Sequence, residues 1–456
     1  MSMSRFDADL IRRHNVNGPR YTSYPTADQF RDGDWKDAYG NSIRTTNVHT
    51  LSLYMHVPFC AKICYYCACS KINTANVKRA ESYVQRMVHE MALHSSLIEA
   101  PHTVEQLHFG GGTPTFLGDD QFERVFEALH NYFNLEDDGT EDFSIEIDPR
   151  DLPTARIDRL AKLGINRVSI GVQDFDPVVQ IAVNRVQSVH ETRAIIDAAR
   201  DNGIRSINID LINGLPKQTV EGFTRTLEQV IQLHPDRLSL YSYAHLPQRF
   251  KTQRQIKSDD LPDAELKLKL LGTAVNMLSD AGYEYVGMDH FAKETDSLIQ
   301  ARKDGSLHRN FQGYTTHGHC QLIGLGVSSI GNIGQLYVQN SKTLHEYYQA
   351  IDAGELAIAR GFESDRQDVV IGQVIQDLMC KFEIDMPAFK TRTGLDFREL
   401  FSDQWPRLQL FEHDGLLELQ ANRIKVTDQG RFLIRNICMT FDAYLSQDTR
   451  RFSKAI

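Results

Sequence analysis

Four of the seven cysteines of this 456-residue chain lie within ten residues, and this cluster constrains the fold more than any other feature of the sequence. Cys60, Cys64, Cys67 and Cys69 follow the spacing C-x3-C-x2-C-x-C, which is too dense for a chance distribution. Several thiol groups on one short loop are typical of a metal centre. The spacing then decides which metal the loop binds.

Zinc and an iron-sulfur cluster are the two candidates. Zinc sites usually take ligand pairs from two separate segments, although His56 could complete a Cys3His set on this loop. A [4Fe-4S] cubane spreads its irons over a few ångströms, so three thiolates on consecutive turns can bind three corners and leave the fourth iron open. The spacing, with Tyr66 directly before the third cysteine, resembles the signature of radical S-adenosylmethionine (SAM) enzymes, in which SAM chelates that iron. We therefore favour a cluster held by Cys60, Cys64 and Cys67 over zinc or a disulfide.

Charge and composition exclude several classes of protein. The formal net charge of −10 argues against a nucleic-acid partner, and so against a zinc-dependent nucleic-acid-binding protein. Charges interrupt the N-terminal segment, and no run of eighteen apolar residues occurs, so we expect neither export nor membrane insertion. Cys320, Cys380 and Cys438 are isolated, and we expect small buried side chains there. A reducing cytoplasm fits these thiols and the cluster.

Short apolar runs alternate with helical patterns from residue 51 to about 246, which predicts repeated strand-helix units and a parallel sheet. Three of the helical patterns end in glycine, at Gly164, Gly203 and Gly282, as expected where a helix stops before a strand. The predicted strands are Leu51–Val57, Glu105–Phe109, Phe143–Asp148, Arg167–Gln173, Ser206–Ile212 and Arg237–Tyr243.

Polar residues on alternate strand positions favour a barrel over an open sheet. Glu146 and Asp148 face away from Ile145 and Ile147, and in the following units Asp210 faces away from its apolar neighbours. Polar strand faces need a polar interior, which a wide barrel provides. We therefore predict an α/β protein with a partial (β/α)6, TIM-like radical SAM barrel and closing extension over residues 51–350. An N-terminal arm and lid over 1–50 precedes it, and a mainly helical, winged-helix-like domain over 360–456 follows it.

A glycine turn and polar strand ends place a ligand at one rim of this barrel. The segment HFGGGTPT, His108 to Thr115, ends the second strand and resembles the radical SAM glycine motif that binds the amino group of SAM. Functional residues of barrels gather at the carboxyl ends of strands. Any one of the polar residues there could be purely structural, but together on the rim that carries the cysteine loop they predict ligand contact. These residues are Tyr54, Glu146, Gln173, Asp210 and Ala244, with Arg185 just beyond one strand.

Segments spread over nearly the whole chain, from about residue 11 to the C-terminus, make a family resemblance specific. They are GPRYTSYPTA (Gly18 to Ala27), HVPFCAKICYYCACSKI, HFGGGTPT, SIEIDPR, GVQDF, VNR, NIDLINGLPKQT, YAHLP, GMDHFA, LHRNFQGYTT and RNICMTFDAYL. Together they resemble the oxygen-independent coproporphyrinogen III oxidase family. A related family of non-catalytic heme chaperones shares the barrel but generally lacks the fourth cysteine and the GPRYTSYPT arm. That chaperone role is the alternative function.

The resemblance implies anaerobic oxidative decarboxylation of two propionates of coproporphyrinogen III to vinyl groups, giving protoporphyrinogen IX, by a 5′-deoxyadenosyl radical made from SAM at a [4Fe-4S] cluster. It also implies two bound SAM molecules. Contacts to the first are carried over to Tyr54, Gly111, Glu146 and Ile330. Contacts to the second are carried over to Tyr66, Gly112, Thr113, Gln173, Arg185, Asp210 and Ala244. Ala68 and Asn213 depart from the family pattern, which has Gly and Tyr there.

The implied substrate carries four carboxylates, so its pocket should offer cations. Our candidates are Arg20, His290, His308 and Arg309, with Tyr21 in the arm beside Arg20; a core role for the two histidines is equally well supported. Cys69 is only one residue beyond Cys67, so we predict that it is not a cluster ligand and leave its role open. An unidentified electron donor and a monomeric state complete the expectations.

Overall fold

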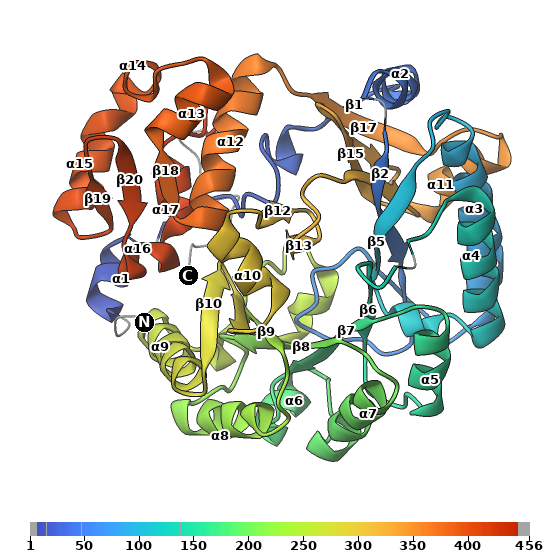
Figure 1. The fold of residues 1–456 in the computed structure, drawn as a ribbon. Helices are drawn as coiled ribbons and strands as arrows, with labels where there is room; N and C mark the ends of the chain where they lie inside the picture. The colour runs from blue at the N-terminus through green and yellow to red at the C-terminus, as the bar shows by residue number, and fades with distance from the viewer. Residues whose placement is uncertain (1–6, 15, 47, 137, 446–456) are drawn as a thin grey trace.

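The computed structural model describes residues 7–14, 16–46, 48–136 and 138–445. Residues 1–6 and 446–456, which belong to the predicted arm and C-terminal domain, lie outside the described residues. Most of the chain is built on one 13-stranded sheet with the strand order β1-β17-β16-β15-β14-β2-β5-β6-β7-β8-β9-β11-β10 (Figure 1). Within the described ranges, no helix is long and apolar enough to cross a membrane.

The six predicted barrel strands are confirmed, each within two residues of its predicted ends. The six strands pair parallel with one another, and β14 (Gln321–Leu325) adds a seventh parallel strand beside β2, which the sequence did not predict. All seven therefore end at one edge of the sheet, the edge that the cysteine loop enters. The six are β2 (Thr50–Val57), β5 (Thr103–Gly111), β6 (Asp142–Ile147), β7 (Arg167–Gln173), β8 (Ser206–Asn213) and β9 (Arg237–Ser242).

The outer face of the parallel strands is apolar and is covered by helices, while polar side chains occupy the inner face. Ile145 and Ile209 are fully buried, whereas Glu146 and Asp210 on the opposite faces keep some exposure. The covering helices form an arc along the right and lower sides of Figure 1. They are α3 (Lys78–Ser95), α4 (Asp119–Tyr132), α5 (Ala155–Lys162), α6 (Pro177–Ala182), α7 (Val189–Asp201), α8 (Val220–Ile231) and α9 (Ala264–Asp280).

Antiparallel strands extend the sheet at both edges. At one edge the chain turns at Met288 (φ 51°) and forms the hairpin β10 (Tyr283–Gly287) and β11 (His290–Lys293). Strand β11 then pairs antiparallel with β9. The other edge continues through β15 (Ile330–Ile333), β16 (Leu336–Asn340), β17 (Ile358–Glu363) and β1 (Arg31–Asp32). In the chain, α10 (Ser297–Asp304) and the hairpin β12 (His308–Asn310) and β13 (Gly313–Thr315) follow β11, and α11 (Leu344–Asp352) connects β16 to β17.

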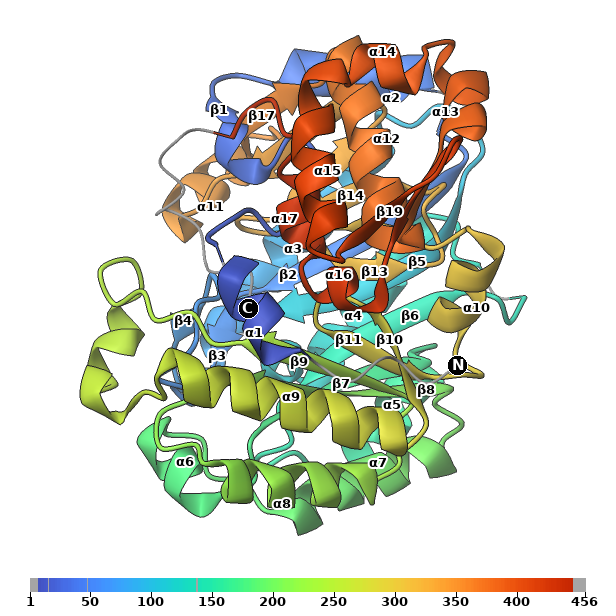
Figure 2. The ribbon, with the colours of Figure 1, turned by 90° about the vertical axis from the view of Figure 1, so that its left-hand side faces the viewer.

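A mainly helical C-terminal region lies beside the barrel, at the upper left of Figure 1 and the upper right of Figure 2. The predicted wing is present as β19 (Leu417–Leu419) and β20 (Arg423–Val426), and β18 (Glu383–Asp385) joins them as a third strand. The helices are α12 (Arg366–Lys381), α13 (Met386–Thr393), α14 (Phe397–Leu400), α15 (Trp405–His413), α16 (Asp428–Phe432) and α17 (Ile434–Cys438).

The N-terminal arm packs against this helical region. It contains α1 (Ala8–His14) and, further along, α2 (Lys36–Thr46). His14 lies 2.8 Å from Asp414, and the Arg435 guanidinium donates to the Pro19 carbonyl oxygen at 2.9 Å. Tyr21 donates to Asp442 at 3.0 Å. The segment between α1 and β1 is thereby held at the junction of barrel and helical region.

Helix α3 fixes the end of β2 through two buried polar side chains. Glu90 is fully buried and accepts hydrogen bonds from the Gly326 amide at 2.7 Å, the Tyr347 hydroxyl at 2.7 Å and the Asn340 side chain at 2.6 Å. Burial raises the pKa of Glu90 to about 7, although the three donors oppose that shift. Two turns earlier on α3, the Tyr83 hydroxyl donates to the His56 carbonyl at 2.6 Å. The chain entering the cysteine loop is thus tied to α3.

Replacing Glu90 by alanine would leave these three buried donors without their acceptor. We expect Glu90→Ala to lower the free energy of unfolding by about 2–4 kcal/mol, measured by urea unfolding. The matched control Glu127→Ala removes an exposed carboxylate from α4 and should change it by less than about 0.5 kcal/mol. Equal stability of the two variants would contradict a structural role for the Glu90 network.

Candidate cluster and cofactor site

The cysteine loop leaves the carboxyl end of β2 and is closed by a short pair of parallel strands, β3 (Phe59–Cys60) and β4 (Ile72–Asn73). Two neighbouring segments hold it in place. The Asn184 side chain, from the chain after β7, donates to the Ile63 carbonyl at 2.7 Å. Thr252 donates to the Cys67 carbonyl at 3.0 Å. The loop therefore has a fixed shape set by contacts from far along the chain.

The four thiols of the loop border one cavity of about 420 Å³. Cys60 and Cys64 are 8% exposed, Cys67 is half-buried and Cys69 is exposed. Within the part of the chain that the structure describes, their donor atoms do not form a group lying within 4.8 Å of one another, the spacing that a single ion would require. A cubane binds each thiolate at a different iron, so wider spacing fits a [4Fe-4S] cluster better than zinc.

His56, the alternative fourth zinc ligand, has both ring nitrogens engaged. Its Nε2 lies 3.0 Å from the Ser70 carbonyl oxygen and must donate there, which leaves Nδ1, 3.1 Å away, to accept from the Tyr54 hydroxyl. Burial lowers the pKa of His56, so the ring is neutral. The ring also lies against Gly111, where an added Cβ would come within 2.5 Å of it. His56 therefore supports the rim and does not face the thiols as a ligand.

Two buried arginines converge on the Cys64 sulfur, a feature that the sequence interpretation had only half identified. Arg150 Nη2 lies 3.3 Å from Cys64 Sγ and Arg185 Nη1 lies 3.4 Å from it. Asp148 pairs with both guanidiniums, at 2.6 Å and 3.2 Å. Burial acts to raise the pKa of Asp148, but the charges of Arg185 and Arg150 hold it below its ordinary value. The sequence interpretation placed Asp148 on the polar face of its strand without giving it a role, and it included Arg150 only as the last residue of the SIEIDPR segment.

The glycine turn after β5 packs directly against the start of the cysteine loop. The Gly112 amide donates to the Val57 carbonyl at 2.8 Å, and an added Cβ at Gly112 would lie 2.7 Å from the Pro58 backbone. Gly111 adopts φ +108°, and its amide donates to a carboxylate oxygen of Glu146 at 3.2 Å. The hydroxyl of Thr113, which follows Gly112, lies 3.4 Å from Cys60 Sγ. The turn joins the thiols to the polar strand ends.

All eleven residues carried over for SAM lie around two adjoining cavities. The 420 Å³ cavity is bordered by Tyr66, Gly111, Gly112, Thr113, Glu146, Gln173, Arg185, Asp210 and Ala244. Tyr54 and Ile330 border a neighbouring cavity of about 370 Å³, and Glu146 borders both. Two details differ from the sequence interpretation: Tyr54 and Asp210 lie three residues before the ends of β2 and β8, and Ala244 lies two residues beyond β9. The side chains still reach the rim because they point into the barrel.

Asp210 is a carboxylate of this rim whose pKa is raised. Burial raises the pKa of Asp210 to about 6, and the charge of Glu146 adds to the shift. Ser169 and Asn208 donate to the two carboxylate oxygens of Asp210, each at 2.9 Å, and these hydrogen bonds limit the rise in its pKa. Gln173 at the end of β7 has φ +69°, a conformation that costs energy for a residue other than glycine and that clusters at functional sites.

The candidate substrate residues are brought together in part. The Arg20 guanidinium pairs with Asp289 and lies 5.9 Å from the Tyr241 ring centroid. Arg309 lies 4.8 Å from the Tyr314 ring centroid. His290 packs edge-on against both rings, at 6.1 Å and 5.5 Å. Tyr241 also borders the 420 Å³ cavity, so the group of Arg20, His290 and Arg309 adjoins the site.

Arg309 has the features of a residue that meets an anion. It is 3% exposed, and no described residue accepts a hydrogen bond from its Nε or Nη1. Burial, with Arg309 nearby, lowers the pKa of Arg20 to about 10. Burial and the charges of Arg20 and Arg309 lower the pKa of Arg435, also buried, to about 9. The sequence interpretation did not single out Arg435, which lies in the RNICMTFDAYL segment.

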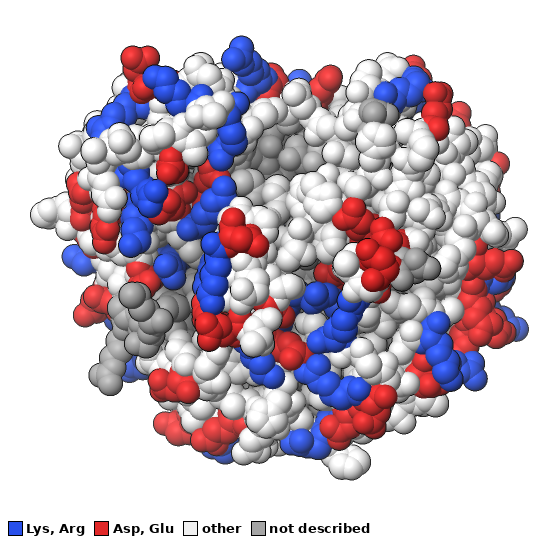
Figure 3. Space-filling view, in the orientation of Figure 1, with Lys and Arg blue, Asp and Glu red and all other residues white. Residues whose placement is uncertain are grey.

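The remaining candidates have different surroundings. Burial first, then the charges of Arg309 and Arg20, lowers the pKa of His290 to about 3, so it is neutral and cannot serve as the predicted cation. Burial also lowers the pKa of His308. His308, Arg309 and Tyr21 border a third cavity of about 510 Å³ between barrel, arm and α12. On the face in Figure 3, Lys and Arg are interspersed with Asp and Glu and do not form one broad basic surface.

Comparisons with known proteins bear on both the fold and the site. The Radical SAM superfamily matches residues 54–230, and the HemN C-terminal domain matches residues 365–433. The oxygen-independent coproporphyrinogen III oxidase of Pseudomonas aeruginosa is 52% identical over 455 residues, covering 99% of each chain. Its Escherichia coli counterpart is 44% identical over 460 residues, covering 100% of each. The solved structure of coproporphyrinogen III oxidase (HemN) from Escherichia coli, described as a radical SAM enzyme, superposes with a TM-score of 0.93 at 42% identity, covering 98% of this chain and 100% of that one.

The cluster ligands can be separated from Cys69 by substitution. After anaerobic reconstitution with iron and sulfide, we expect Cys64→Ser to lose most of the roughly four irons per chain, whereas Cys69→Ser keeps most of them. Iron and sulfide analysis with the visible absorbance of the cluster would measure this. Equal loss of iron in both variants would make Cys69 a ligand and overturn the assignment.

Proposed function

This chain belongs to the oxygen-independent coproporphyrinogen III oxidase family, and we propose that the cavities at its barrel rim carry out the reaction of that family with the residues described above. The protein is a radical SAM oxidoreductase that converts two propionates of coproporphyrinogen III to vinyl groups, giving protoporphyrinogen IX in porphyrin and heme biosynthesis. The observation that carries the residue assignment is convergence. Three cysteines and nine of the eleven residues carried over for SAM border one cavity. The heme-chaperone alternative is not favoured, because the full-length relatives are oxidases.

When bound, the [4Fe-4S] cluster and SAM supply a 5′-deoxyadenosyl radical, which can take a hydrogen atom from an unactivated propionate carbon. Cys60, Cys64 and Cys67 hold the cluster in this proposal. Arg150 and Arg185 donate to the Cys64 sulfur, and their positive charges would offset the negative charge of the cluster and its ligands. Asp148 keeps both guanidiniums aimed at that sulfur.

Two adjoining cavities support two SAM molecules. The molecule nearest the cluster would meet Tyr54, Gly111, Glu146 and Ile330, where the two cavities join. The second would meet the residues around the 420 Å³ cavity: Tyr66, Gly112, Thr113, Gln173, Arg185, Asp210 and Ala244. Glu146, which borders both cavities, would separate the two molecules. Its carboxylate already accepts the Gly111 amide, which fixes its orientation before either molecule binds.

A propionate of the substrate would supply an acceptor for Arg309, because no described residue accepts a hydrogen bond from its Nε or Nη1. Arg20 and Arg435 lie near Arg309 and raise the local positive potential around it. Arg20, Tyr21 and His308 would complete the polar wall, and the neutral His290 would contribute ring contacts. The arm, residues 1–50 in our division of the chain, would close the barrel of residues 51–350 from the side of the helical domain, residues 360–456.

The proposed reaction places requirements on the cellular setting of the protein. The radical chemistry needs an external one-electron donor, whose identity is open. We assign the protein to a reducing cytoplasm as a monomer that binds no nucleic acid. All seven cysteines are free, which suits such a compartment.

Activity and the role of Arg309 can be tested together. The reconstituted protein, given coproporphyrinogen III, SAM and a reductant without oxygen, should form 5′-deoxyadenosine and a fluorescent porphyrin after oxidation of the product. We expect Arg309→Met to raise KM for coproporphyrinogen III at least about tenfold, because a buried charge-assisted contact is lost.

Arg124→Met is the matched control, because Arg124 pairs with Glu81 on the outer surface of α4 and should leave KM unchanged. If a wild-type sample with a full complement of the iron-sulfur cluster forms neither product, the proposed function is wrong. If the wild-type protein turns over and Arg309→Met has an unchanged KM, Arg309 does not bind the substrate. The proposed function itself would still stand.

Asp210 predicts a pH dependence of SAM binding. Its folded-state pKa of about 6 means that the carboxylate becomes protonated as pH falls through 6. Because SAM carries a net positive charge, we expect the affinity of the second SAM to fall by up to about tenfold per pH unit below 6. Equilibrium dialysis of the clustered protein between pH 5 and 7 would follow the bound SAM from two molecules towards one. Asp210→Asn should bind more weakly and lose this pH dependence; a profile identical to wild type would contradict the role of Asp210.

A further inference from the structure

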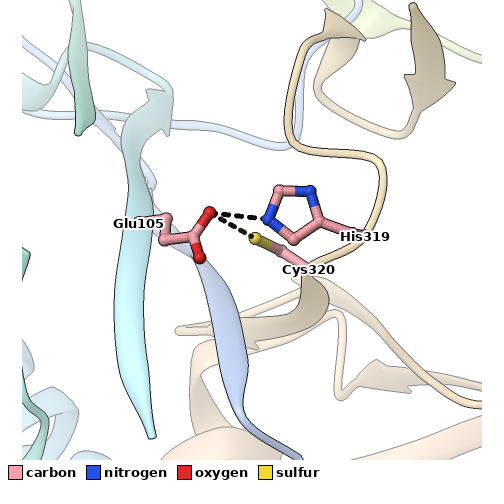
Figure 4. Close-up of side chains that lie close together, drawn as sticks. All are labelled: Glu105, His319 and Cys320. Atoms are coloured by element: carbon pink, nitrogen blue, oxygen red, sulfur yellow. Dashed lines mark hydrogen bonds and ion pairs between the residues drawn. The ribbon is translucent and has the colours of Figure 1, made fainter. Parts of the chain in front are cut away.

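Three side chains of types that commonly bind metal ions lie together at the end of the barrel opposite the cysteine loop. Glu105 lies near the start of β5, and His319 and Cys320 lie on the turn that leads into β14 (Figure 4). One oxygen of Glu105 lies 2.6 Å from His319 Nε2 and 3.7 Å from Cys320 Sγ. The three donor atoms all lie within 4.8 Å of one another, the only such group among the described residues.

We propose that Glu105, His319 and Cys320 form a binding site for a single Zn²⁺ ion, separate from the iron-sulfur site. Thiolate, imidazole and carboxylate are the three side-chain ligand types that zinc prefers. Zinc-ligand bonds of about 2.0–2.3 Å in a tetrahedron place the donor atoms about 3.3–3.8 Å apart. The sulfur-oxygen distance already matches. The nitrogen-oxygen distance must lengthen from hydrogen-bond contact, which rotation of the 57% exposed His319 side chain allows.

The protonation of the group also fits a metal. The imidazole donates from Nε2, and the Cys320 thiol is placed to donate to the same oxygen of Glu105. Within the described ranges no arginine or lysine pairs with Glu105, so its charge is met only by these two donors. On zinc binding the thiol proton leaves to solvent and the imidazole proton moves from Nε2 to Nδ1. One proton is released per ion, and thiolate and carboxylate together neutralise the two charges of zinc.

The site is far from the cluster loop and joins different strands. Glu105 precedes Gly111 by six residues on β5, which corresponds to about 20 Å at 3.3 Å per residue. Strands β14 and β5 flank β2 in the sheet. Zinc would therefore fasten the amino ends of the two strands on either side of β2, whose other end carries the cysteine loop. Three protein ligands leave one position for water or for His317, whose ring centroid is 6.1 Å from that of His319.

The sequence interpretation treated Cys320 as an isolated, buried thiol. In the fold Cys320 is half-exposed. It is also not isolated, because the turn before β14 brings it beside Glu105, which lies more than 200 residues earlier in the chain. At this end of a barrel, residues serve stability more often than catalysis. A structural zinc ion is the role that this placement favours.

The test uses the protein with its cluster already assembled, so that iron occupies the cysteine loop. One equivalent of Zn²⁺ is added without oxygen, and zinc and iron are measured after passage over a chelating column. We expect one zinc per chain with unchanged iron, and a zinc X-ray absorption spectrum with one sulfur at about 2.3 Å and the remaining ligands nitrogen or oxygen at about 2.0–2.1 Å. Zinc should also raise the Tm of the protein.

Cys320→Ser and the isosteric Glu105→Gln should each weaken zinc binding by at least about tenfold and abolish the rise in Tm. His89→Ala, which removes an exposed histidine from α3, is the matched control and should bind like wild type. Iron content shows whether each variant has folded. Zinc bound equally by all variants, a spectrum without sulfur, or a spectrum with several sulfurs and loss of iron would each overturn the proposal.

Discussion

The parallel pairing of seven strands is the constraint on which the rest of this structure depends. Because β14, β2, β5, β6, β7, β8 and β9 run in one direction, everything that follows their carboxyl ends must gather at one rim. The cysteine loop, the glycine turn and the polar residues of β6 to β8 span about 150 residues of the chain, from Cys60 to Asp210, and still border one cavity. The opposite ends of the same strands bring together Glu105, His319 and Cys320.

Buried arginines explain how an acidic protein can hold anionic groups. The chain as a whole has a net charge of −10, yet Arg150 and Arg185 converge on the Cys64 sulfur and Arg309 is buried near Arg20 and Arg435. Burying a guanidinium is costly unless an anion meets it. Asp148 and the Cys64 sulfur accept hydrogen bonds from the first pair. In the second group Arg20 pairs with Asp289, whereas no described residue accepts a hydrogen bond from Nε or Nη1 of Arg309, a demand that a carboxylate of the proposed substrate would meet.

The rim is held from outside by groups that take no part in the chemistry. Tyr83 and Glu90 of α3 fix the end of β2 and the turn at Gly326, and Thr252 and Asn184 fix the cysteine loop. Such supports matter because a site built from separate segments is only as well ordered as its surroundings. Each support comes from a segment distant in sequence, so each depends on the whole fold.

The sequence by itself determined the elements whose signals are local. Alternating polarity located the six strands within two residues, glycine marked the three helix ends, where φ is +99°, +76° and +85°, and cysteine spacing pointed to the cluster loop. Tertiary structure alone decided which distant groups meet: the seventh parallel strand, the hairpin at Met288, the approach of Arg150 to Cys64 and the contact of Cys320 with Glu105. It also reversed the expected charge of His290, because burial beside two arginines keeps that ring neutral. The physical reason is that periodicity and spacing are properties of neighbouring residues, whereas pairing, burial and electrostatic environment arise only when remote segments pack together.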